Sequence, residues 1–237
     1  RDLVLRAGDH LSTRLDCGRS ECHASAAEGA LASPMTHVLA RGLEGDLGDG
    51  YDPSCVLACH AVGEPGVPDG GFAHVARTLG WGPPRKGRPG GWAALPRSLR
   101  RLSGVGCTTC HGPGAIPTPA ARWTILRSDV CATCHDAPTR YGHVAAWRAS
   151  RMSRSDQSPE TRIEPCAGCH TTSGYLARIG VRSGELRVDP PADAGSIGIS
   201  CSACHAPHGD HSGVALLRTP EIPDWLGETP HADRSAV

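Results

Sequence analysis

The sequence predicts a fold of irregular loops and a few short α-helices, with little or no β-sheet. Three observations indicate this. Phe, Trp and Tyr make up only 4% of the 237 residues, and Gly and Pro number 30 and 20. A chain so poor in large apolar side chains has difficulty offsetting the conformational entropy that it loses on ordering. The third observation is a count of twelve cysteines, which favours disulfides or bound groups as the additional source of stability.

The helical signals are short and the breakers are frequent. Residues 96–103 and 141–153 are the best candidate helices, the first opening with a proline that the first helical position tolerates. Residues 24–39 are a weaker candidate because Pro34 interrupts them. We expect loops in the segments rich in Gly and Pro, which are 62–71, 82–91, 112–119 and 188–195. No alternating strand pattern occurs, and we expect residues 1–237 to form a single unit organised by its cofactors.

The cysteines fall into six pairs, and a histidine follows the second cysteine of every pair. We name the motifs sites 1 to 6 in chain order: 17–23, 55–60, 107–111, 131–135, 166–170 and 201–205. Sites 3 to 6 read Cys-x-x-Cys-His, which is the attachment signature of c-type haem. Its two thiols form thioethers with the haem vinyl groups, and the adjacent histidine becomes the proximal iron ligand. Sites 1 and 2 place four and three residues between their thiols but share the histidine.

The motifs therefore predict six haem c groups, with their iron, in one chain. The predicted thioether residues are Cys17, Cys22, Cys55, Cys59, Cys107, Cys110, Cys131, Cys134, Cys166, Cys169, Cys201 and Cys204. The predicted proximal ligands are His23, His60, His111, His135, His170 and His205.

Two other uses of paired cysteines compete with haem attachment. Zinc ribbons also use Cys-x-x-Cys knuckles, but they do not need a histidine after every pair. Disulfides within such short loops constrain the unfolded chain little. The haem interpretation uses all twelve thiols, and six porphyrins would supply the missing apolar bulk.

Seven further histidines are available as distal ligands for six irons, which favours bis-histidine ligation. We expect His208, His143, His74 and His37 to be ligands, followed by His10 and His211. His231 is the seventh, and Met35 and Met152 are the thioether alternatives.

Charge and hydropathy exclude two classes of partner. Arg and Lys number 24, as do Asp and Glu, so no basic excess points to nucleic acid. The sequence contains no run of about 18 apolar residues, so no membrane span is predicted.

Residues 104–209 resemble the multihaem cytochromes related to the nitrifier tetrahaem shuttle and to the hydroxylamine oxidoreductase and octahaem reductase families. The resemblance lies in Gly-Val-Gly before Cys107, His-Gly-Pro-Gly from His111, His-Thr-Thr-Ser-Gly-Tyr from His170, and Cys-His-Ala-Pro-His-Gly from Cys204. In such proteins the histidine of the Pro-His-Gly turn ligates a neighbouring haem, which implies this role for His208. The family usually has a histidine at the end of a Trp-x-x-Ser-x-His motif, whereas this chain has Met152 there. Either Met152 ligates that haem or the role has moved to His143. We favour His143 because seven further histidines are available for six irons.

The resemblance implies electron transfer outside the cytoplasm, in the periplasm or the extracellular space. The small number of residues per haem also resembles extracellular cytochrome nanowires, so the expected partners are further copies of the chain or other redox cytochromes. The alternative is a redox enzyme of the nitrite, hydroxylamine or tetrathionate type with one open haem. We favour the non-enzymatic carrier because enough histidines exist to close every iron.

Overall fold

The structure is a computed structural model that describes residues 24–63, 66–111, 126–136, 142–157, 159, 163, 166–179, 197–208 and 218. These residues are helix and loop without a β-sheet, and one isolated antiparallel bridge joins Ala61 to Ser103. The predicted fold class is thereby confirmed for this part of the chain. None of the helices in these ranges is both long and apolar enough to cross a membrane.

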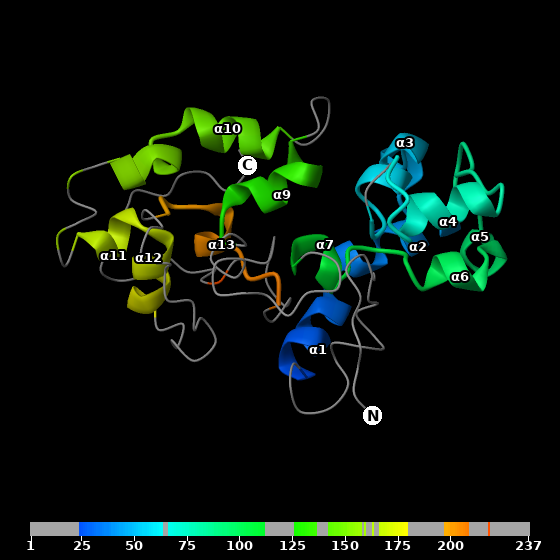
Figure 1. Cartoon of the computed structure of the whole chain (residues 1–237), viewed down its shortest axis with the longest axis horizontal. Helices are drawn as coiled ribbons and strands as arrows, with labels where there is room; N and C mark the ends of the chain where they lie inside the picture. Colours follow the sequence, from blue (N-terminus) through cyan, green and yellow to red (C-terminus); the bar gives the residue numbers. More distant parts are fainter. Residues whose placement is uncertain are drawn as a thin grey trace.

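The helices form two groups with two helices between them (Figure 1). The first group contains α2 (Pro34–Glu44), η2 (Gly48–Gly50), α3 (Pro53–Ala58), α4 (Phe72–Thr78), α5 (Gly91–Ala94) and α6 (Arg97–Arg100). The second group contains α9 (Ser128–His135), α10 (His143–Ala149), η3 (Met152–Gln157), α11 (Ala167–His170), α12 (Thr172–Arg178) and α13 (Cys201–Cys204). The helices α1 (Ala24–Ala32) and α7 (Cys107–His111) lie between the groups.

Pro34 interrupts the predicted helix 24–39, as expected, and it is also the first residue of a new helix, α2. Ser33 caps α2, and its side chain accepts a hydrogen bond from the Met35 amide while Pro34 occupies the first turn. Proline is tolerated there because the first amides of a helix lack partners within the helix. The helix ends at Gly45, whose φ of 92° is left-handed. The candidate helix 24–39 is therefore two helices, α1 and α2.

The other two candidate helices exist but are shorter than predicted. Residues 96–103 contain α6, which covers only Arg97–Arg100. Residues 141–153 contain α10, which ends where Ser150 takes an extended conformation. The helix η3 follows it from Met152. The motif helices α3, α7, α9, α11 and α13 were not predicted as helices.

A small protein core lies in the first group. Its buried residues are Leu39, Leu43, Tyr51, Val56, Ala61, Phe72, Ala76, Leu95 and Leu99. Trp81 and Trp92 pack against this core, and the Phe72 and Trp81 rings meet edge to face with centroids 5.5 Å apart. Four of the nine aromatic residues of the chain thus gather in this core. The low aromatic content of the whole chain hid this local concentration.

The second group buries fewer and smaller apolar side chains. Over the described residues from 126 onward, the buried apolar residues are Leu126, Val144, Leu176 and Ala203. Hydroxyl groups take part of the remaining interior: Thr172 Oγ1 donates to the Gly198 carbonyl at 2.6 Å and accepts from the Ser200 amide at 3.0 Å. This part of the molecule has little apolar material of its own around sites 4, 5 and 6. The prediction that residues 1–237 form one cofactor-organised unit stays a prediction.

Candidate haem-binding site

Each of the five described motifs lies on or at the end of a short helix. Site 2 begins on α3, sites 3 and 4 lie on α7 and α9, site 5 spans the start of α11, and site 6 lies on α13. A helix brings residues three and four positions apart onto one face, so the thiols and histidine of a motif are presented together. None of the ten cysteines of these motifs is in a disulfide. Site 1, with Cys17, Cys22 and His23, lies outside the described residues.

Site 2 keeps the backbone geometry of the shorter motifs despite its extra residue. At sites 5 and 6, the histidine amide donates to the carbonyl of the first cysteine: His170 to Cys166 at 3.1 Å and His205 to Cys201 at 2.9 Å. At site 2, the His60 amide also donates to the Cys55 carbonyl, at 3.1 Å. The insertion is therefore absorbed within the turn, and the histidine returns to an equivalent position.

His111 and His208 face each other. Their ring centroids are 6.0 Å apart and their planes differ by 14°. A metal–imidazole bond is about 2 Å long, and a ring centre lies about 1 Å behind its nitrogen, so two rings on opposite sides of one metal ion have centroids about 6 Å apart. The separation suits one iron between His111, the predicted proximal ligand of site 3, and His208, which was predicted to ligate a neighbouring haem.

His135 and His143 form a second pair of this kind. Their centroids are 6.2 Å apart with an interplanar angle of 47°. The two rings come from α9 and α10, and the Arg148 guanidinium joins these helices by ion pairs with Asp136 and, at 3.8 Å, Asp129. Trp147 fixes α10 from its other side, since its Nε1 donates to the Ile199 carbonyl at 2.8 Å. Met152 is the first residue of η3, beyond the end of α10, and it is 52% exposed.

Burial favours the neutral form of two rings that are predicted as proximal ligands, and the neutral form is the one that ligates metals. Burial lowers the pKa of His60, against a smaller opposing effect of Asp52. Burial also lowers the pKa of His135, and the neighbouring His143 and His205 rings lower it further. His60 Nδ1 is buried without a hydrogen-bond partner in the described part of the chain, and such groups are rare in folded proteins. These features fit rings that are held for a metal-bearing group.

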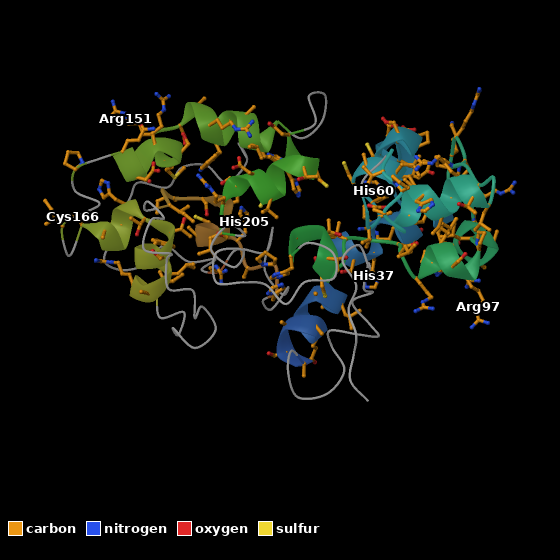
Figure 2. All side chains as sticks on the ribbon, viewed as in Figure 1. His37, His60, Arg97, Arg151, Cys166 and His205 are labelled. Atoms are coloured by element: carbon orange, nitrogen blue, oxygen red, sulfur yellow. The ribbon has the colours of Figure 1, made fainter. Side chains whose placement is uncertain are left out.

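Two other predicted distal ligands make hydrogen bonds to the backbone. A ring nitrogen of His37, Nε2, lies 2.7 Å from the Leu31 carbonyl. His74 Nδ1 accepts from the Gly70 amide at 3.0 Å. Neither ring is paired with a motif histidine within the described ranges. Figure 2 shows His37 and His60 on the side of the first group that faces α7, opposite Arg97. The predicted ligands His10 and His211, together with His231, lie outside the described residues.

The thiols of different sites lie close together. Cys134 Sγ is 3.9 Å from the Cys59 carbonyl, and Cys59 Sγ is 4.0 Å from the Thr133 carbonyl. Burial, with Cys59 adding to it, raises the pKa of Cys134 to about 12. The Cys131 thiol is hydrogen-bonded to Cys201, which raises the pKa of Cys131 and lowers that of Cys201 to about 6. A thiol of low pKa is the better nucleophile for forming a thioether.

Some positioning residues had no signal in the sequence. Ser128 Oγ accepts from the Cys201 amide at 3.2 Å and thereby joins α9 to site 6. A Cβ atom added at Gly29 would lie 2.1 Å from the His208 carbonyl oxygen, so α1 approaches His208 closely. Both contacts join distant parts of the chain, which local patterns do not reveal. Among the described residues, no three His, Cys, Asp or Glu side chains converge as a metal-only site.

Residues 130–206 match the family of cytochrome c554 and c-prime. The matched range lies inside the stretch 104–209 and contains sites 4, 5 and 6, which supports covalently bound haem c and electron transfer as the chemistry of this segment. No curated protein matches the chain. An undecahaem cytochrome from the S-layer of Carboxydothermus ferrireducens is similar over 92% of this chain and 42% of its own, with 18% identity and a TM-score of 0.45. The chain thus spans less than half the length of that protein.

Proposed function

We propose that the chain binds six haems c covalently, one at each site, and carries electrons through them with bis-histidine ligation. The observation that carries this proposal is the two pairs of histidine rings, one at site 3 and one at site 4, with centroids 6.0 and 6.2 Å apart. Each pair joins a motif histidine to one of the histidines left over after the six motifs. These centroid distances are close to the distance of about 6 Å that two imidazoles on opposite sides of one metal ion would have.

The residues divide into three roles under this proposal. The cysteine pairs hold the porphyrins, the histidine after each pair binds iron from one side, and His208 and His143 close the irons of sites 3 and 4. Haem supplies one-electron chemistry, whose potential the axial ligands and burial adjust. The protein binds and orients the haems and excludes water from them. With both axial positions taken, the irons of sites 3 and 4 would be closed to a substrate, which favours a carrier over an enzyme.

We place the protein outside the cytoplasm, in the periplasm or the extracellular space, because c-type attachment takes place beyond the cytoplasmic membrane of bacteria. The partners are then other redox cytochromes or further copies of the chain. The filament subunit and the periplasmic shuttle both follow from the same haem content.

The haem count and the state of the irons test the proposal together. Intact-protein mass spectrometry should give the mass of the chain plus six haems. Electron paramagnetic resonance of the oxidised holoprotein should show low-spin iron only. Carbon monoxide added to the reduced protein should leave its absorption spectrum unchanged.

Two results would count against a pure carrier. A high-spin fraction that binds carbon monoxide or nitrite would favour the enzyme alternative with an open haem. A mass corresponding to fewer haems would contradict one haem at each site, and proteolysis with peptide mapping would identify the unused motif. Electron microscopy of native material separates the filament from the shuttle.

A further inference from the structure

Site 4 contacts motifs on two sides in the described part of the chain. Its helix α9 meets different neighbours at its two ends. Ser128 Oγ accepts from the Cys201 amide of site 6 at 3.2 Å, and Cys134 Sγ is 3.9 Å from the Cys59 carbonyl of site 2. The neighbours come from opposite sides, since site 2 belongs to the first group of helices and site 6 to the second (Figure 1).

Other contacts support both junctions. Ser128 Oγ, at the start of α9, accepts from the Cys201 amide at 3.2 Å and lies 3.3 Å from Cys201 Sγ. On the other side, Cys59 Sγ lies 4.0 Å from the Thr133 carbonyl, inside the site 4 motif. Cys110 of site 3 is near enough to act electrostatically on Cys131 and Cys134.

We infer that site 4 is the junction of the cofactor chain: its residues would hold a haem beside the haem of site 6, on the side of Cys131 and Ser128, and beside the haem of site 2, on the side of Cys134. This rests on the proposed function. A thioether joins the cysteine sulfur to the porphyrin ring through one carbon of a former vinyl group, so motifs whose residues touch would hold their porphyrins close together. Electrons that pass from site 2 to site 6 would then cross site 4.

Site 5 provides a matched comparison. Its helix α11 packs on α12 and η3. Figure 2 shows Cys166 at the outer edge of the second group, far from the labelled His205. Removing the site 5 haem takes away one chromophore without removing a junction.

Circular dichroism of the Soret band tests the inference on the holoprotein. Haems in edge contact couple their transitions and give a two-signed signal, whereas separated haems do not. We compare two double variants. One combines Cys131→Ala and Cys134→Ala at site 4, and the other combines Cys166→Ala and Cys169→Ala at site 5. Mass spectrometry first shows that each variant lacks one haem. The site 4 variant should lose a larger fraction of the two-signed signal than the site 5 variant loses.

A second variant covers the case in which the site 4 double variant does not fold. His143→Met keeps both thioethers, and methionine ligation raises the reduction potential of that haem. Early reduction of a junction haem lowers the reduction potentials of the haems beside it. As the site 4 step of the redox titration moves to higher potential, further steps should therefore move to lower potential.

The outcomes separate the two claims. Equal fractional losses in the two double variants, or a shift of one redox step alone in His143→Met, would overturn the junction while leaving the electron carrier intact. Absence of haem from the wild-type motifs would instead remove the proposed function.

Discussion

At the scale of single residues, Gly29 controls the space available to a predicted iron ligand. A Cβ atom at this position would lie 2.1 Å from the His208 carbonyl oxygen and 2.6 Å from its carbonyl carbon. Backbone atoms cannot move aside as the end of a flexible side chain can. The position of His208 opposite His111 therefore requires a residue without a side chain at position 29 of α1.

We predict that Gly29→Ala opens the iron of site 3. Alanine in a helix would by itself favour folding by about 1 kcal/mol, so a loss here reports the clash with His208. The expected result is a high-spin signal and carbon monoxide binding by about one haem of the six. Electron paramagnetic resonance and absorption spectroscopy measure both. Gly142→Ala is the control, because a Cβ there meets nothing within 4 Å.

The choice between His143 and Met152 is also made by single side chains. The His143 ring lies 6.2 Å from the His135 ring, whereas Met152 is half exposed in η3. We predict that His143→Ala produces one high-spin haem and that Met152→Ala leaves the spectrum unchanged. The wild-type ferric spectrum should lack the weak long-wavelength sulfur-to-iron band. A band that is present and disappears in Met152→Ala would show that the methionine is the ligand.

At the scale of elements, short helices depend on their caps because few of their backbone groups are satisfied within the helix. The buried Ser33 side chain caps α2, the helix that carries Leu39 and Leu43 into the core of the first group. The end of α1 and the start of α2 meet at this residue, since the Ser33 amide donates to the Ala30 carbonyl at 3.2 Å. One side chain thus sets the junction of two elements.

We predict that Ser33→Ala lowers the free energy of unfolding by about 1 kcal/mol, the usual cost of losing an N-cap. Chemical denaturation followed by far-ultraviolet circular dichroism measures the change. Ser98→Ala in α6 is the control, because Ser98 is exposed and alanine favours the helix. Equal stability of the two variants would contradict the role of the cap.

At the scale of the whole molecule, the apolar residues are unevenly distributed. The first group has a core of leucines and aromatics, including the fully buried Phe72 and Leu99. The described residues from 126 onward bury few apolar side chains, among them Val144 and Leu176. The two groups should therefore depend on bound porphyrin to different degrees, because apolar burial is the main stabilising contribution to folding.

We predict that the chain produced without haem attachment loses the structure of its second group and keeps partial order in the first. Hydrogen exchange followed by mass spectrometry should show residual protection in residues 39–102 and little in 126–208. Leu99→Ala in the holoprotein provides the reciprocal test, with an expected loss of roughly 2–5 kcal/mol from the core cavity. A cooperative melt of the whole haem-free chain would refute the dependence on haem.

The sequence by itself determined the features that depend on neighbouring residues. The pairing of cysteines with a following histidine is a local pattern, and the low aromatic content with frequent Gly and Pro led to a fold of loops and short helices. Histidine counts and the family resemblance pointed to His208 and His143. The geometry of the insertion at site 2 could be anticipated only in outline.

Tertiary structure alone decided which distant residues meet. The facing of His111 with His208, the contact of Cys131 with Cys201, and the gathering of aromatics around Phe72 join segments far apart in the chain. Local patterns describe what one turn of backbone presents, whereas such contacts depend on how all the helices pack and on close approaches such as that at Gly29.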